Sequence, residues 1–152
     1  MRFALYQPDI PQNTGTMLRL CACLDIPVDL IGPTGFDMSD RALRRAGMDY
    51  LQHVRLERHA SWSIFNDTRT ENGRRLVLLS THAETPYTGH DFRNHDTIMV
   101  GRESAGVPRD VAEAADVRLR IPVQNGLRSL NVSVAAAMVL GEATRQLASF
   151  DK

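Results

Sequence analysis

The sequence predicts a single α/β domain in which a largely parallel sheet carries helices on both faces. Short apolar runs typical of buried strands alternate along the chain with segments of helical periodicity. The length of 152 residues suits one domain. No repeat, linker or low-complexity segment divides the chain, so we treat residues 1–152 as one unit.

The first half of the chain is expected to hold three strands and three helices. Phe3–Tyr6 predicts the first strand, which Pro8 and Pro11 end. Asn13 or Thr14 is the expected cap of a helix that runs to about Leu24. The elements expected next are a strand at 28–31, a helix at 40–46 capped by Ser39, a strand near 50–56 and a helix around 61–68.

The second half is expected to add strands at 76–79, 97–100 and 118–121 and a short helix at 109–114. A final helix spans 130 to about 149, and its first ten residues leave almost no polar face. A helix that is apolar all round is buried on all sides. We favour a dimer interface as its cover, and a central core helix in a monomer is the alternative.

Charge and targeting signals narrow the class of protein. Lys plus Arg and Asp plus Glu number 18 each, so binding of nucleic acid by bulk positive charge is excluded. Local clusters remain: Arg118, Arg120 and Arg128 lie in an acid-free stretch, and Arg41, Arg44 and Arg45 lie together. These clusters predict contacts with RNA phosphates. The alternative is that they form only a solvent-exposed face of the protein.

The N-terminus lacks the apolar run of a signal peptide, and no segment is long and apolar enough to span a bilayer. These features predict a cytoplasmic protein that binds no membrane. The two cysteines, Cys21 and Cys23, have no second pair, and the five histidines form no ligand spacing. We therefore expect no metal site and two buried apolar thiols.

Four loops are candidates for a site, because ligands bind beyond the carboxyl ends of strands in open parallel sheets. They cover residues 7–15, 80–82, 101–108 and 122–129. The dinucleotide fingerprint, the Walker A loop, H-E-x-x-H and the G-x-S-x-G elbow are all absent. The glycines of the 101–108 loop predict either close approach of the backbone to a ligand or a turn that needs positive φ.

Three segments resemble, in order and spacing, the motifs of SPOUT-class RNA 2′-O-ribose methyltransferases. They are Asn13–Ala22, Gly101–Pro108, and Ile121-Pro122 followed by Arg128–Ser133. The resemblance runs along nearly the whole chain and is greatest to the short members that act on the tRNA wobble nucleotide. Thr16 departs from the pattern, because relatives often have Asn there.

The resemblance implies a C-terminal trefoil knot, a homodimer, S-adenosylmethionine as cofactor and the anticodon stem-loop of tRNA as partner. The implied reaction transfers a methyl group to the ribose 2′-OH of the wobble cytidine or modified uridine. The resemblance also implies cofactor contacts at Leu79, Gly101, Ile121 and Ser129. Core packing alone would also explain why Leu79 and Ile121 are apolar. A non-catalytic RNA-binding module and methylation of a different RNA site are the alternatives.

Arg19 is the expected catalytic residue. The family mechanism casts this arginine as the group that activates the hydroxyl, but a pKa above 12 makes free arginine a poor base. We prefer a clamp on the substrate phosphate that also stabilises the developing alkoxide. A surface ion pair is the alternative. Asn13 is expected to orient Arg19 or to cap the helix, and Glu103 to hold Arg19 or Asn13, or to be an exposed loop acid.

Overall fold

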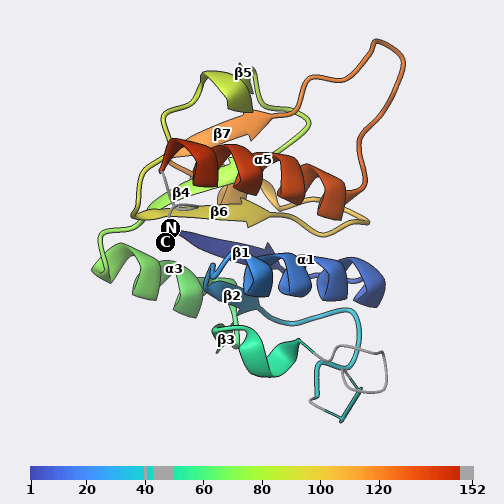
Figure 1. The fold of residues 1–152 in the computed structure, drawn as a ribbon, viewed down its shortest axis with the longest axis vertical. Helices are drawn as coiled ribbons and strands as arrows, with labels where there is room; N and C mark the ends of the chain where they lie inside the picture. Colours follow the sequence, from blue (N-terminus) through green and yellow to red (C-terminus); the bar gives the residue numbers. More distant parts are fainter. Residues whose placement is uncertain (40, 43–49, 148–152) are drawn as a thin grey trace.

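A computed structural model of the chain describes residues 1–39, 41–42 and 50–147. In this part of the chain one sheet has the strand order β3-β2-β1-β6-β4-β7-β5, and every strand pair in it is parallel (Figure 1). The strands are β1 (Arg2–Tyr6), β2 (Val28–Ile31), β3 (Leu56–His59), β4 (Arg75–Leu79), β5 (Thr85–Pro86), β6 (Asp96–Val100) and β7 (Val117–Arg120). The predicted parallel sheet is therefore confirmed.

Helices cover both faces of the sheet, also as predicted. The described helices are α1 (Pro11–Cys23), α3 (Trp62–Glu71), α4 (Arg109–Glu113) and α5 (Val132–Gln146), with short 3-10 turns η1 (Leu51–His53) and η2 (Tyr87–Gly89). Side chains of α1 and α5 share one core cluster, and those of α3 and α4 share the other. Figure 1 shows α1 and α5 in front of the sheet, with α5 across its β6–β7 half.

The central strands are buried on both faces, as expected for a sheet between two helical layers. All five residues of β6 are buried. Along β4 the side chains alternate, so that Val77 joins the cluster under α1 and α5 while Leu76 and Leu78 join the cluster under α3. These buried runs carried the strongest strand signal in the sequence.

The edges of the sheet differ from the prediction. The strand expected near 50–56 is wrong: Leu51–His53 is the η1 turn, and β3 follows at Leu56–His59. Leu51 and Val54 pack against the core from the turn, while β3 is an edge strand with exposed Glu57 and Arg58. The last predicted strand begins one residue earlier, at Val117, and leaves Ile121 beyond its end. The two-residue edge strand β5 gave no apolar signal.

Two helix starts also differ. α1 begins at Pro11 with Ile10 as its N-cap, so neither Asn13 nor Thr14 caps it. Proline favours the first helical position because its φ is already helical and its missing N–H has no partner to lose there. α5 begins at Val132 and is capped by Asn131, whose side chain accepts from the N–H groups of Ser133 and Val134.

The helix expected at 40–46 lies largely outside the described residues, although the Ser39 hydroxyl does accept from the N–H of Ala42. The end of the final helix is described only to Leu147.

The cysteines are not both buried, contrary to expectation. Cys21 is buried on α1, and this burial raises the pKa of its thiol to about 12, which keeps it protonated. Cys23 is exposed, because residues two apart on a helix point to different faces. Within the described residues, none of the helices combines the length and hydrophobicity needed to cross a bilayer.

α5 buries one face and leaves the other open in the single chain. Ala136, Val139, Leu140 and Ala143 are fully buried against the sheet and α1. On the opposite face Val134 is 50% exposed and Met138 is 39% exposed. The first part of the helix is therefore apolar on both faces, as the sequence indicated, but the single chain does not bury it on all sides.

Candidate active site

The four loops singled out in the sequence follow four consecutive strands of the sheet, β1, β6, β4 and β7. Because neighbouring strands are parallel, these loops all leave the sheet at its carboxyl edge. β1, β6 and β7 point toward the right of Figure 1, where the long loop that joins β7 to α5 projects beyond the sheet. Sheet topology thus gathers the three sequence motifs at one edge.

Asn13 links all three motifs through its side-chain amide. Its Nδ2 lies 3.5 Å from Oε1 of Glu103, which belongs to the loop after β6. Its Oδ1 accepts a 3.0 Å hydrogen bond from Nδ2 of Asn131, the cap of α5. The hydroxyl of Ser133 also donates to the backbone oxygen of Asn13, at 3.2 Å. Of the alternatives for Glu103, contact with Asn13 is the one the geometry bears out.

Asn13 can make these contacts because it is not the helix cap. It is the third residue of α1, and Pro11 starts the helix in its place. An amide carries both donors and an acceptor, so one Asn side chain can bridge a carboxylate on one side and a second amide on the other. The role as a cap is therefore wrong, and the role as a bridge between the motifs replaces it.

Asp9 and Glu103 form a carboxyl pair beside this bridge. Oε2 of Glu103 accepts from the backbone N–H of Asp9 at 3.0 Å, and the Ser104 hydroxyl donates to Oδ2 of Asp9. Burial, and then the neighbouring Asp9, raise the pKa of Glu103. Hydrogen bonds with Glu103 and Ser104, aided by the charge of Arg102, lower the pKa of Asp9. The two pKa shifts run in opposite directions, so as the pH falls Glu103 takes up a proton before Asp9 does.

Arg102 lies next to the Asp9–Glu103 pair. Its Nη1 donates to Oε1 of Gln7 at 3.5 Å, and its Nε lies 3.7 Å from Oδ2 of Asp9. Nε of Arg102 and Oδ1 of Asp9 are buried and have no hydrogen-bond partner among the described residues. Unpaired buried polar atoms are uncommon and concentrate at functional sites. Asp9, Gln7 and Arg102 did not stand out as site residues in the sequence, since only the closure of the loops brings them together.

Arg19 lies on the exposed face of α1, which it shares with Gln12, Thr16 and Cys23. Its guanidinium carbon sits over the ring of Tyr50, 4.6 Å from the ring centre. Within the described part of the chain, Arg19 contacts this ring and is paired with no carboxylate. The Arg19 side chain is exposed.

Three of the four expected cofactor contacts stand at adjacent strand ends. Leu79 is the last residue of β4, Gly101 follows β6, and Ile121 follows β7. In the register of the sheet, Leu78 pairs with Met99 of β6 and Leu79 pairs with Leu119 of β7. Leu79, Gly101 and Ile121 therefore lie within about two residues of one another along the strand direction. Leu79 and Ile121 are partly buried and pack on the core, which explains their apolar character and still leaves part of each side chain accessible.

The glycines of the 101–108 loop have a structural explanation. Gly101 cannot carry a side chain because a Cβ there would come within 2.7 Å of the backbone of Gly106. Arg102 and Gly106 exchange two backbone hydrogen bonds, which close the loop, and Gly106 has φ +63°. Of the two interpretations given by the sequence, the turn that needs positive φ holds for Gly106, and the close approach at Gly101 is to the chain itself.

Ser129, the fourth expected contact, does not stand at a strand end. It belongs to the exposed segment 122–130 that leads into α5 and precedes the cap Asn131 by two residues. The Asn131–Asn13 bond ties the end of this segment to α1. The apolar side chains at the strand ends and the polar loop beside them suit an adenosine-type ligand, which needs an apolar wall with a few hydrogen-bonding groups.

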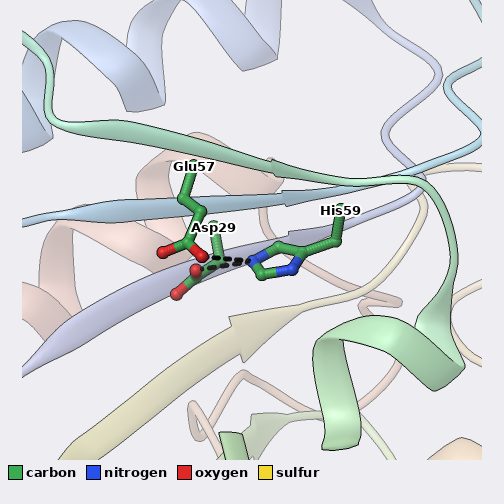
Figure 2. A group of neighbouring side chains, drawn as sticks. All are labelled: Asp29, Glu57 and His59. Carbon is green, nitrogen blue, oxygen red and sulfur yellow. Dashed lines mark hydrogen bonds and ion pairs between the residues drawn. The ribbon is translucent and has the colours of Figure 1, made fainter. Parts of the chain in front are cut away.

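A second polar cluster lies on the other face of the sheet, under α3. Asp29, Glu57 and His59 place ligand-type atoms within 4.8 Å of one another, and both carboxylates point toward the His59 ring (Figure 2). Arg2 already donates two 2.7 Å hydrogen bonds to Asp29 and one of 2.9 Å to Glu57. The guanidinium supplies the cation there, so this cluster joins β1, β2 and β3 rather than offering a vacant metal site.

Comparisons with known proteins identify relatives of this chain. Residues 1–141 match the model of the SpoU rRNA Methylase family. A tRNA (cytidine(34)-2′-O)-methyltransferase of Beijerinckia indica is 60% identical over 149 residues, which make up 98% of this chain and 93% of the relative.

Solved structures agree with these relatives. One, described as giving structural insights into the 2-OH methylation of C/U34 on tRNA, matches with TM-score 0.89 and 39% identity over 97% of this chain and 95% of its own. An AdoMet-bound rRNA methyltransferase from Sinorhizobium meliloti matches with TM-score 0.83 and 26% identity over 96% of this chain and 56% of its own. The match confirms the expected fold class, that of the trefoil-knot methyltransferases.

Proposed function

The chain belongs to the SpoU rRNA methylase family, and we propose that it methylates the ribose 2′-OH of the wobble nucleotide, cytidine or uridine 34, in tRNA. The 60% identity to a cytidine-34 enzyme over nearly the whole chain supports the substrate. The observation that carries the assignment is the hydrogen-bonded junction at Asn13, which joins the three motif segments at the carboxyl edge of the sheet. An RNA-binding module without catalysis would not need Arg19, which lies on the exposed face of the same helix as Asn13.

S-adenosylmethionine, the methyl donor in this proposal, supplies a methyl group on a positively charged sulfur. Leu79 and Ile121 offer the apolar wall for its adenosine part, and the backbone at Gly101 offers polar groups at the neighbouring strand end. Ser129 would add a hydroxyl from the loop before α5. The AdoMet-bound relative supports this donor.

Arg19 would act on the acceptor. The ribose oxygen must lie in line with the methyl–sulfur bond, which would break as the new C–O bond forms and leave S-adenosylhomocysteine. The hydroxyl gives up its proton to water. A guanidinium that grips the adjacent phosphate with two N–H donors fixes the ribose and stabilises negative charge on the 2′-oxygen. Its position on the open face of α1 leaves room for RNA.

We also propose that the chain works as a homodimer through the open face of α5. Val134 and Met138 are large apolar side chains that the single chain leaves exposed, and Leu130 is 39% exposed just before the helix. A second copy of the same face would cover them in an isologous contact. The dimer would also double the number of basic side chains available to tRNA.

Contacts with tRNA phosphates are proposed for the exposed side chains of Arg118, Arg128 and Arg41. Arg120 is partly occupied, since it donates to the backbone oxygen of Glu84. Arg44 and Arg45, of the second predicted cluster, lie outside the described residues. The anticodon stem-loop is the proposed docking element, because no second domain is needed to grip a small RNA hairpin by its shape.

The decisive experiment incubates the protein with labelled S-adenosylmethionine and tRNA that lacks the wobble methyl group, followed by mass spectrometry of digested tRNA. The expected result is one 2′-O-methyl group at position 34, absent with Arg19→Ala. Binding of S-adenosylhomocysteine and tRNA without any transfer would support the non-catalytic module. Transfer to another nucleotide would show that the methylated site is not position 34.

A further inference from the structure

Tyr50 is the described residue that holds the Arg19 side chain. The guanidinium lies over the aromatic ring at 4.6 Å from the ring centre, within the range of a cation–π interaction. Arg19 comes from α1 and Tyr50 from the turn before β3, so the contact joins two elements far apart in sequence. None of the three motifs contains Tyr50.

The backbone fixes Tyr50 in place. Its carbonyl accepts the N–H of His53 at 2.9 Å, which closes the η1 turn. The next residue, Leu51, packs its side chain on the core formed partly by α1. Tyr50 is 37% exposed, so its ring is accessible at the surface where Arg19 lies over it. The ring is therefore a fixed surface, whereas Arg19 would otherwise be a freely rotating side chain.

An aromatic ring suits this position better than a carboxylate would. A carboxylate would neutralise Arg19 and occupy its N–H donors, the groups required to bind a phosphate. A ring face attracts the cation through its quadrupole and leaves both the charge and the outer donors available. The contact thus orders the guanidinium before RNA arrives without competing for it.

We propose that Tyr50 is a positioning residue for methyl transfer, which orients the Arg19 guanidinium toward the substrate phosphate. This inference rests on the proposed role of Arg19 in ribose methylation. Tyr50 acts through Arg19 and not by contact with RNA. Pre-ordering matters because misplacing a catalytic group by about 1 Å can cost up to about a hundred-fold in rate.

The test compares Tyr50→Phe with Tyr50→Leu in the full-length protein. Single-turnover rates of methyl transfer to an anticodon stem-loop are measured, together with the Kd of the same RNA. Tyr50→Phe keeps the ring and should keep the wild-type rate. Tyr50→Leu should lower the rate by about two- to five-fold or more, the factor that an exposed cation–π contact is worth. Equal thermal midpoints and equal affinity for S-adenosylhomocysteine would show that the fold and cofactor site are intact.

A double-mutant cycle then separates positioning from direct RNA contact. The cycle is measured as the Kd of the stem-loop, because Arg19→Ala is expected to transfer no methyl group. Tyr50→Leu is expected to weaken RNA binding when Arg19 is present and to leave it unchanged in an Arg19→Ala background. An equal effect in both backgrounds would mean that the ring stacks on RNA itself and would overturn the proposal. No effect of Tyr50→Leu in the wild-type background, or an equal loss in Tyr50→Phe, would also overturn it.

Failure of the proposed function has a different signature. If the wild-type protein transfers no methyl group to position 34, the substrate assignment fails regardless of Tyr50. If the wild type is active and Arg19→Ala is equally active, the role of Arg19 fails. The positioning proposal alone fails when Arg19 is essential and Tyr50→Leu changes nothing.

Discussion

At the scale of single residues, Arg19 places a guanidinium group, with its positive charge and paired N–H donors, on the exposed face of α1. Arg19→Lys keeps the charge and removes the paired donors. We expect kcat/KM to fall about ten- to a hundred-fold, since a hydrogen bond to a charged group is worth about 1.5–3 kcal/mol. Single-turnover methylation of an anticodon stem-loop measures this change. Turnover near the wild-type value would eliminate the bidentate clamp and leave a role for charge alone.

Glu103 gives a prediction about pH. Its pKa is raised in the folded state by burial and by Asp9, so the folded protein holds a proton that the unfolded chain releases at lower pH. The stabilisation from this proton is full below the ordinary glutamate pKa of about 4.3 and is lost as the pH rises through the raised pKa. Asp9 has a lowered pKa and acts in the opposite sense, losing its contribution as the pH falls.

Glu103→Gln is a neutral mimic of the protonated acid. At neutral pH we expect it to raise the free energy of unfolding slightly, by about 0.5 kcal/mol at most, because the side chain is partly solvated. Below about pH 4 the two proteins should become equally stable. Urea unfolding at a series of pH values measures the difference. A variant that is less stable at neutral pH would show that the ionised carboxylate contributes to the fold.

At the scale of elements, helix boundaries decided what the site residues do. Asn13 looks like a cap in the sequence because Asn is a preferred cap, but Pro11 begins α1 and frees the amide to bridge Glu103 and Asn131. Asn131, which the sequence placed inside a helix beginning at Leu130, is the actual cap of α5. Pro11 is itself a local signal for the start of α1, whereas the bond between Asn13 and Asn131 depends on the packing of α1 against α5.

The cap of α5 therefore has both a structural and a positioning role, and a matched pair of variants can separate them. Asn131→Ala removes the cap of α5 and the donor to Asn13, while Ser61→Ala removes the cap of α3, whose hydroxyl accepts from Ile64. Each should lose about 1 kcal/mol of stability. Only Asn131→Ala should also slow methyl transfer at a temperature where both proteins are folded. Equal turnover in the two variants would contradict a role for the Asn13–Asn131 bond in the site.

At the scale of the whole molecule, the open face of α5 predicts self-association. Val134 and Ile64 are matched apolar residues, 50% and 51% exposed, on opposite faces of the sheet. We expect Val134→Asp to convert the dimer to monomer and Ile64→Asp to leave it unchanged, because burying an unpaired charge at an interface costs several kcal/mol. Sedimentation velocity over a range of concentrations measures both. A dimer unaffected by Val134→Asp would locate the interface elsewhere.

Zero net charge makes local arginines the source of any salt-dependent RNA binding. Arg128→Ala should reduce the slope of log K against log salt by about 0.7–0.9 for each phosphate that the protein no longer neutralises. Arg109→Ala is the control, since this exposed side chain is already paired with Glu113 on α4. Binding of the stem-loop at several salt concentrations measures the slopes. Equal slopes in the two variants would remove Arg128 from the RNA surface.

The amino-acid sequence was enough to predict the parallel α/β fold, because the buried strands β1, β4 and β6 carry continuous apolar runs. Motif order identified the class of enzyme and pointed to Arg19. Edge elements escaped prediction, since β3 and β5 are short, polar and paired on one side only. The Asp9–Glu103 pair, the bridge at Asn13 and the ring beneath Arg19 were decided by tertiary structure alone. Each depends on contacts between segments about 30 to 120 residues apart, which only the order of strands in the sheet and the packing of α1 against its neighbours bring within hydrogen-bonding distance.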